Sequence, residues 1–262
     1  METAPDRLLQ SFVRTMKRII SILFIVIVPL TALAISDFPV SDDFDDNSFD
    51  TSKWSEYETS CVNSEANQQL EQVYSANTSG AECDTSTLTT SYNFDEMQVN
   101  VNLVQVASPG VDNIFLIGNI GSSYGDRAMW LCSSATCYTY IQSDYSAIAG
   151  CGSTYCSSES ITPGANTYLK FREESGMFYF EYSTDAKETW NTSYSTPSMN
   201  IPFSLSSTRV VMSGYEYSGT GATTENTLIF DNFMISDTET SATTTTINVG
   251  SIMINNGSYI ID

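Results

Sequence analysis

Residues 97–106 read MQVNVNLVQV, a regular alternation of apolar and polar side chains. Successive side chains of a β-strand point to opposite faces, so this period of two predicts a strand. One face carries Val99, Val101 and Leu103, and the other begins with Asn100 and Asn102. We therefore expect a half-buried strand whose valine–leucine face packs on a core, with the asparagine face toward solvent.

Other segments are rich in β-branched and aromatic residues, and turn residues separate them roughly every 8–12 positions. Strands are expected at 113–120, 128–132, 137–143, 167–173, 177–183, 208–216 and 226–236. No convincing helical period follows residue 36, so the pattern predicts an all-β sandwich or barrel. The stretch at 35–237 has a length that one such domain can hold.

The C-terminal part has a different composition. Residues 238–246 read TETSATTTT, which is typical of a Thr-rich linker. Residues 247–262 read INVGSIMINNGSYIID, which suggests two short strands around an Asn-Gly turn. An isolated hairpin is marginal in water, so we expect this piece to be a docked hairpin or the truncated start of a further domain.

The N-terminal segment 1–34 has the marks of a secretory signal peptide. Lys17 and Arg18 precede an apolar run at 19–30, and Ala-Leu-Ala follows at 32–34. Cleavage is expected after Ala34, and Met16 is a second candidate for the start. The protein is thus expected to be secreted or on the cell surface, with an uncleaved signal anchor as its only link to a membrane.

The composition excludes several classes of function. The chain has 31 acidic and 10 basic residues, a net charge of −21, so nucleic acid and anionic lipid are poor partners. It has no histidine, which excludes Ser-His-Asp and Cys-His catalysis and histidine metal sites. An enzyme built on this chain would have to use carboxylates, tyrosine, lysine or cysteine.

All six cysteines follow the signal segment, and an even number in an exported chain predicts three disulfides. The preferred pairs are Cys61–Cys83, Cys132–Cys137 and Cys151–Cys156. A nested alternative joins Cys132 to Cys156 and Cys137 to Cys151. The two C-x4-C units are also compatible with zinc, which export and the absence of histidine disfavour.

Three segments in order resemble a known family. They read DDFDDNSFDTSKW at 42–54, MFYFEYSTDAKETW at 177–190 and TLIFDNFMISD at 227–237. Together they are similar to the concanavalin A-like lectin/glucanase (laminin G-like) jelly roll. The resemblance implies a two-sheet antiparallel sandwich with the opening segment beside the closing strand. It also implies a structural calcium ion linking the two, at the matching positions Asp43 and Asp231.

Part of the middle segment resembles a second motif, the Asp-box of sialidase-type propellers, S-x-D-x-G-x-T-W. Ser183, Asp185, Thr189 and Trp190 match, and Lys187 stands where the motif has glycine. A propeller repeats the motif in every blade, and this chain has it once. We therefore interpret it as a structural hairpin, in which the polar side chains bond to the turn backbone.

The glucanase branch of the resembling family carries E-x-D-x-x-E on one strand. The nearest approach in this chain is taken to be Asp95-Glu96, whose adjacent side chains would point to opposite faces of a strand. Glu173, Glu174 and Glu181 also lack the spacing. We lean against an enzyme, with a hydrolase using atypical carboxylates, or a structural piece of a larger surface protein, as alternatives.

The best candidate for a ligand face is the cysteine-rich region 121–156. Exposed aromatic rings can stack on sugar rings, and loops on a rigid sandwich often carry recognition. The candidate binding residues are Tyr124, Trp130, Tyr138, Tyr140, Tyr145 and Tyr155. The sequence therefore predicts a non-catalytic module that binds carbohydrate or mediates adhesion, with a glycan or a cell-surface ligand as its partner.

Overall fold

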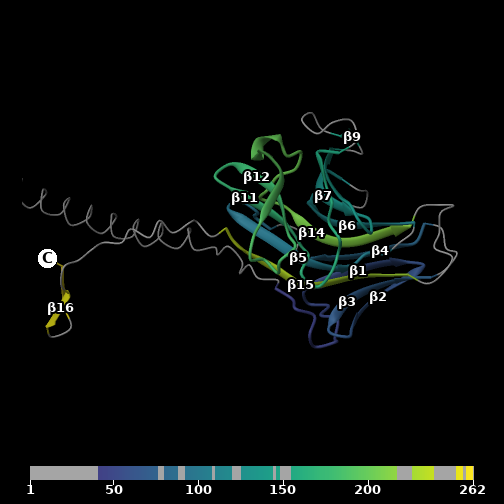
Figure 1. Ribbon diagram of the computed structural model, residues 1–262, viewed down its shortest axis with the longest axis horizontal. Coiled ribbons are helices and arrows are strands. Elements are labelled where there is room, and N and C mark those ends of the chain that lie inside the picture. Colours follow the sequence, from purple (N-terminus) through teal and green to yellow (C-terminus); the bar gives the residue numbers. More distant parts are fainter. Residues whose placement is uncertain are drawn as a thin grey trace, which may run out of the picture. The chain divides into compact units, whose positions relative to one another are not determined.

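The computed structural model describes residues 41–75, 80–87, 92–107, 110–119, 125–143, 155–216 and 226–238, and short strands at 146–147, 252–255 and 258–261. Every described residue belongs to one unit of the chain, Ser41–Asp262 (Figure 1). The predicted signal peptide lies outside the described residues. Among those residues, no helix has the length and apolar character needed to cross a membrane.

In the described part of the chain, two antiparallel sheets make up the sandwich. The eight-stranded sheet has the order β1-β4-β14-β6-β7-β8-β10, with β9 beside β8. Its strands are β1 (Trp54–Thr59), β4 (Glu82–Thr87), β14 (Arg209–Glu216), β6 (Val111–Gly118), β7 (Arg127–Cys132), β8 (Cys137–Ser143), β10 (Ser157–Glu159) and β9 (Ser146–Ala147). Some neighbours in this order, such as β4, β14 and β6, lie far apart in the sequence, which is typical of a jelly roll.

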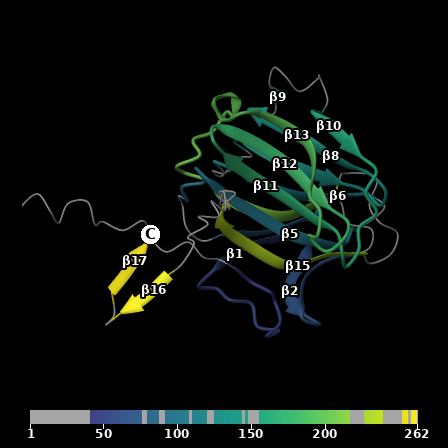
Figure 2. The ribbon, with the colours of Figure 1, turned by 60° about the vertical axis from the view of Figure 1, so that its left-hand side comes forward.

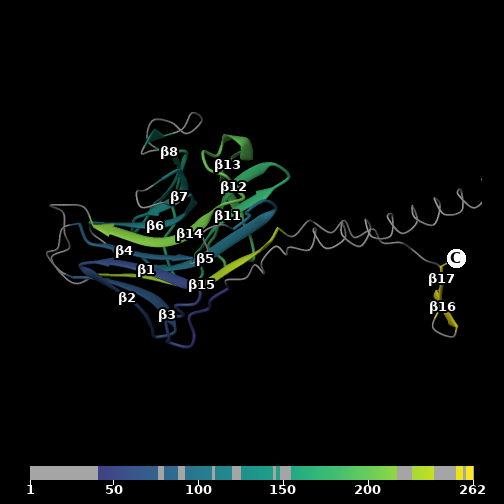
Figure 3. The same cartoon turned by 180° about the vertical axis from the view of Figure 1, so that it is seen from behind.

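The seven-stranded sheet has the order β13-β12-β11-β5-β15-β3-β2, and Figure 2 shows several of these strands side by side. Its strands are β13 (Asn191–Pro197), β12 (Met177–Ser183), β11 (Tyr168–Glu174), β5 (Met97–Gln105), β15 (Asn226–Asp237), β3 (Gln69–Tyr74) and β2 (Cys61–Ala66). A separate hairpin joins β16 (Ile252–Asn255) to β17 (Ser258–Ile261). The all-β class and the two-sheet jelly roll predicted from the sequence are confirmed, and Figure 3 shows the sandwich from behind.

The core lies between the two sheets and is rich in aromatic side chains. Phe115 of β6 packs on Phe171 of β11, with ring centroids 5.0 Å apart. Trp130 of β7 packs edge-on against Phe180 of β12 at 6.0 Å. Because neighbouring residues of a strand alternate, these contacts fix which side chains of each sheet face inward and which face outward.

The opening segment lies against the closing strand. Asp42 and Phe233 exchange two backbone hydrogen bonds of 2.9 and 2.8 Å, and Trp54 packs edge-on against Phe233 at 4.9 Å. The indole nitrogen of Trp54 donates to the Asp42 carboxylate over 2.8 Å. Trp54 and Phe233 are almost completely buried, and each contributes roughly 1.5–3 kcal/mol of transfer free energy.

Strand β5 departs from its prediction. Its valine–leucine face is buried as expected, but Asn100 and Asn102 are only 2% exposed. The strand is in the middle of its sheet, and the larger side chains of Lys170 on β11 and Met234 on β15 flank Asn100. A short polar side chain between long neighbours is shielded even on an outward face.

Two of the predicted disulfides are present in the described residues, Cys61–Cys83 and Cys132–Cys137. The second one rules out the nested alternative and a zinc site that uses Cys132 and Cys137. Cys156 is also disulfide-bonded. Because Cys151 lies outside the described residues, the pair Cys151–Cys156 stays a prediction.

Candidate functional site

The outer face of the eight-stranded sheet, meaning the face turned away from the core, brings together residues from five strands. The strand register aligns one outward residue from each of β4, β14, β6, β7 and β8. In that order they are Asp84, Ser213, Ile114, Leu131 and Tyr138. Strands are about 4.8 Å apart, so this row is roughly 19 Å long, enough for a ligand larger than a monosaccharide.

Three tyrosines predicted as binding residues meet at the β8 end of this face. The ring of Tyr155 lies 5.0 Å from that of Tyr138 and 6.5 Å from that of Tyr140. Tyr155 is 40% exposed. Tyr140 also packs on a small apolar cluster on the same face, formed by Ile114, Leu116, Met129 and Val211. The cluster therefore supports the ring of Tyr140.

Trp130, also predicted as a binding residue, is not on this face. It is 0% exposed and packs in the core against Phe180 and Tyr182. Trp130 pairs with Thr139, which is the inward residue between Tyr138 and Tyr140. The alternation of the strand therefore turns Trp130 away from the outer face. The two other predicted tyrosines, Tyr124 and Tyr145, lie outside the described residues.

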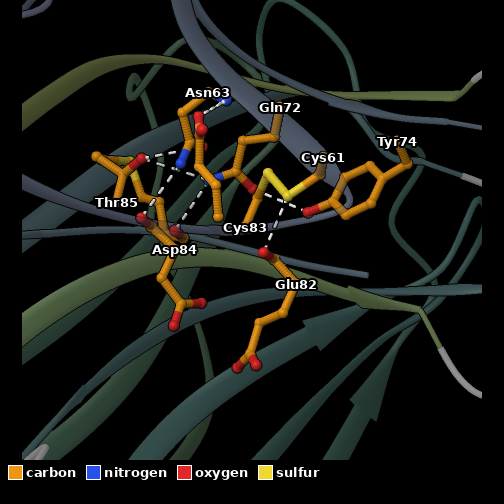
Figure 4. Close-up of a disulfide and its surroundings, with 10 residues drawn as sticks. Cys61, Asn63, Gln72, Tyr74, Glu82, Cys83, Asp84 and Thr85 are labelled. Atoms are coloured by element: carbon orange, nitrogen blue, oxygen red, sulfur yellow. Dashed lines mark hydrogen bonds between the residues drawn. A yellow bond between two sulfur atoms is a disulfide. The ribbon is translucent and has the colours of Figure 1, made fainter. Parts of the chain in front are cut away.

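A pair of carboxylates lies toward the other edge of the same face. Glu82 and Asp84 are two positions apart on β4, and Figure 4 shows both side chains on the side of the strand away from the Cys61–Cys83 disulfide. Burial and then the neighbouring Asp84 raise the pKa of Glu82 to about 7. Burial also raises the pKa of Asp84, although a hydrogen bond from Ser213 and the charge of Arg127 oppose this.

Sequence reasoning missed this pair. The residues Glu82-Cys83-Asp84 have the E-x-D spacing that alternation places on one face of a strand. This spacing is visible in the sequence, but it indicates a shared face only within a strand. No strand is predicted between residues 54 and 87, where β1 to β4 lie. Strands β1, β2 and β4 are rich in Glu, Ser and Thr and lack the apolar residues used to find the others, and in β3 the buried Gln72 interrupts the apolar period.

Asp95 and Glu96, the pair weighed from the sequence, have a structural role. They occupy a turn before β5 instead of a strand, and Glu96 has a φ of 56°. The Glu96 carboxylate accepts a hydrogen bond from the backbone of Ser175, and its backbone N–H donates to Glu173. These bonds join the turn before β5 to β11 and to the residue that follows it, at one end of the seven-stranded sheet.

A cavity of about 240 Å³ lies where the opening segment meets a bulge in β15, and Asp43, Lys187 and Asn232 are among the residues that line it. Asp231, the other predicted calcium ligand, is next to this lining. Burial raises the pKa of Asp231, hydrogen bonds from Asn232 oppose the rise, and the charges of Asp45 and Asp43 add to it.

These residues do not fit a calcium ion. Both carboxylate oxygens of Asp231 accept hydrogen bonds from Asn232, at 2.7 and 2.8 Å, and Asp43 accepts one from Asp45. Within the described ranges, no three Asp, Glu, Cys or His side chains gather as a metal-binding group. The Lys187 side chain lines the same cavity with its positive charge. Calcium needs six to eight oxygen ligands, and a nearby ammonium group opposes it.

No protein-family model matches the chain, and neither does any curated protein sequence. Solved structures do match. One, reported with endo-acting O-glycanases of human gut bacteria that initiate mucin breakdown, is 9% identical with a TM-score of 0.58, covering 77% of this chain and 99% of that one. The catalytic domain of an endo-1,3-β-glucanase (laminarinase) from Thermotoga petrophila is 9% identical with a TM-score of 0.56, covering 77% and 98%.

A third match is a lectin, the carbohydrate recognition domain of Emp46p in its potassium-bound form. It is 12% identical with a TM-score of 0.52, covering 75% of this chain and 96% of that one. The chain therefore has the concanavalin A-like jelly-roll fold, as the sequence segments indicated. Because this fold carries both glycan-cleaving enzymes and lectins, the choice between them depends on the residues of the site.

Proposed function

We propose that this chain is an exported, non-catalytic module that binds carbohydrate on the outer face of its eight-stranded sheet. The observation that carries the proposal is the cluster of Tyr138, Tyr140 and Tyr155 at one end of that face. Tyrosine combines a flat apolar ring with a polar hydroxyl, so it can stack on a sugar ring and bond to its hydroxyls.

The rest of the face supplies the polar groups that a glycan needs. Asp84 and Ser213 lie in one register row with Tyr138. Arg127 on β7 donates two hydrogen bonds to the Gln142 side chain, which fixes both groups on the outer face beside the tyrosines. Aromatic rings at one end of a face, with carboxylate, hydroxyl and amide groups along the same face, are typical of a site that fixes the orientation of a polyhydroxy ligand. The glycan-binding and glycan-cleaving proteins of the same fold support this class of partner.

The test is a glycan-array screen of the full chain, with calcium and then with a chelator. We expect the same binding in both conditions, since the residues at Asp43 and Asp231 do not fit the ion. The Tyr155→Ala variant should lose about tenfold in affinity, because an exposed aromatic contact is worth roughly 1.4 kcal/mol.

Tyr179→Ala is the matched control for that variant. Tyr179 is a partly exposed tyrosine on the seven-stranded sheet, where it packs under Arg172 at 4.0 Å. It lies far from the proposed ligand face in the strand order, so its removal should leave glycan affinity unchanged. Equal losses in the two variants would contradict the location of the site, and no binding to any glycan would contradict the function itself.

A second candidate function is glycoside hydrolysis by Glu82 and Asp84, and the raised pKa of Glu82 is the observation that favours it. A carboxyl group with a pKa near 7 is a competent proton donor at neutral pH, and glycosidases pair such a group with a second carboxylate. The measurement is the release of reducing ends from any glycan that binds. Release that disappears in Glu82→Gln, with binding retained, would establish the enzyme over the binding module.

A further inference from the structure

Lys187 has a backbone conformation that does not suit it. Its φ is +74°, and that of the preceding Ala186 is +60°, so both residues are in the left-handed region. Glycine adopts this region freely, whereas a Cβ atom disfavours it. The Asp-box that this segment resembles has glycine at the position of Lys187. The chain thus carries a lysine in a conformation that glycine would adopt without strain, and strain of this kind is found more often at functional positions.

The Lys187 side chain reaches an acidic part of the molecule. It lines the cavity between the opening segment and the β15 bulge, together with Asp43 and Asn232. Its ammonium nitrogen lies 4.3 Å above the ring of Tyr168. Burial lowers the pKa of Lys187, and the negative charge of Asp231 opposes that shift. An ammonium group is kept in this partly buried place by the ring below it and the carboxylate nearby.

The carboxylates around Lys187 need a positive charge. Asp231 is repelled by Asp45 and Asp43, which approach from the opening segment. Lys53, the other lysine of this neighbourhood, already pairs with Asp42 at 3.3 Å and with Asp50 at 3.8 Å. Without Lys187, the opening segment and the closing strand would present only negative charges to the cavity where they meet.

We propose that Lys187 is a tethered cation, which neutralises Asp231 and the acidic opening segment in the place where a metal ion would otherwise be required. The segment and the closing strand are joined there by the backbone pair of Asp42 and Phe233. The side chain that supplies the charge also fills part of the cavity. In a variant without it, Asp43, Asn232 and the neighbouring Asp231 still carry oxygen atoms at this cavity, and no ammonium group opposes a divalent cation that keeps water molecules as its other ligands.

The test compares Lys187→Gly with its matched control Ala186→Gly in the full chain. Both substitutions relieve a left-handed residue, and only the first removes a charge. Thermal unfolding is followed in a chelator and in millimolar calcium chloride. We expect Ala186→Gly to unfold slightly above the unchanged chain in both solutions. We expect Lys187→Gly to unfold lower in chelator and to rise by at least ~3 °C with calcium, while the unchanged chain does not respond.

Two further variants keep the outcome interpretable. Lys187→Asn removes the charge but keeps a residue that tolerates the left-handed region. It therefore replaces Lys187→Gly in the unfolding measurement if the glycine variant does not fold. Adding Asp231→Asn to either variant removes a ligand and should abolish the calcium response. The proposal is overturned if Lys187→Gly behaves like Ala186→Gly, or if calcium stabilises the unchanged chain to the same extent. It is also overturned if both uncharged variants stay unfolded with and without calcium.

Discussion

Glu181 and Glu82 both point away from the core, one on each sheet, yet their surroundings shift their pKa values in opposite directions. Burial tends to raise the pKa of Glu181, but hydrogen bonds from Arg172 and Lys170 outweigh it and the pKa is lowered. The ammonium of Lys170 lies 2.6 Å from the Glu181 carboxylate, and Trp190 covers the lysine at 3.8 Å. The Glu181 carboxylate is therefore bound by Arg172 and Lys170 and is buried from solvent.

Glu82 has no such partners. Burial and Asp84 raise its pKa to about 7, and no lysine or arginine in the described ranges forms an ion pair with it. The seven-stranded sheet thus pairs its outward carboxylate Glu181 with basic residues, whereas the eight-stranded sheet leaves Glu82 without a basic partner. A carboxylate that the protein has paired with its own cations supports the fold, whereas one left unpaired on a face is available to a ligand or to a proton.

The largest effect is expected from Glu181→Gln. Lys170 and Glu181 are each only 5% exposed, so the substitution leaves a buried ammonium group without its anion. Breaking a buried pair in this way costs about 3–5 kcal/mol of unfolding free energy. Urea unfolding measures it, with Glu82→Gln as the matched control. Equal losses in the two variants would remove the distinction between paired and unpaired carboxylates.

Next in size is the loss of the Cys61–Cys83 disulfide, which joins β2 of one sheet to β4 of the other beside Glu82 and Asp84 (Figure 4). The paired change Cys61→Ala with Cys83→Ala should lower the unfolding free energy by about 3 kcal/mol, since the bond closes a loop of 22 residues. Replacing Cys132 and Cys137 instead should cost less, because that loop spans 5 residues. The reverse order would contradict this account of the cross-link.

The smallest effect is a difference in pH dependence. The pKa of Glu82 is about 7 in the folded chain and 4.5 ordinarily, so its stabilising contribution is full below about pH 4.5 and is lost as the pH rises through 7. Glu181 behaves oppositely: its lowered pKa stabilises the fold above its ordinary pKa, and that contribution is lost on acidification. The unfolding free energy of Glu82→Gln should therefore rise relative to that of the unchanged chain as the pH goes from 5 to 8. The rise should be under ~1 kcal/mol, because solvent screens the pair. If the unfolding free energies of Glu82→Gln and of the unchanged chain changed with pH in parallel, the raised pKa of Glu82 would be contradicted.

The fold could be predicted because its two signals can be read along the chain. One is the apolar–polar alternation within strands, and the other is the order of the three motif segments. Strands β1, β2 and β4 escaped prediction because they are polar and lack an apolar period, and β3 because its central inward residue is the polar Gln72. The burial of Asn100 also could not be predicted, since it depends on Lys170, a neighbour far along the chain. The alternation of a strand assigns each side chain to one face of the sheet. The burial of that side chain depends on the neighbouring strands, which the sheet order determines.

The candidate site was predicted in part. The region 121–156 did contain the cluster of Tyr138, Tyr140 and Tyr155, because loops and edge strands concentrate exposed aromatic rings. Trp130 was misplaced because composition does not say which face of a strand is turned toward the core. Trp130 lies on the inward face of β7, whereas Tyr138 and Tyr140 lie on the outward face of β8. The link between Asp84 and this cluster is invisible in the sequence, since it depends on β14, more than a hundred residues from β4, lying between β4 and β6.

The pairing of Asp42 with Phe233 also has a mechanical consequence. A pull applied through the opening segment and the closing strand enters and leaves the sandwich at neighbouring points on its surface. Because the two segments run antiparallel, such a pull peels their bridge apart one bond at a time instead of shearing many bonds together. Trp54, which packs on Phe233 and bonds to Asp42, is a buried side chain that links the two loaded segments.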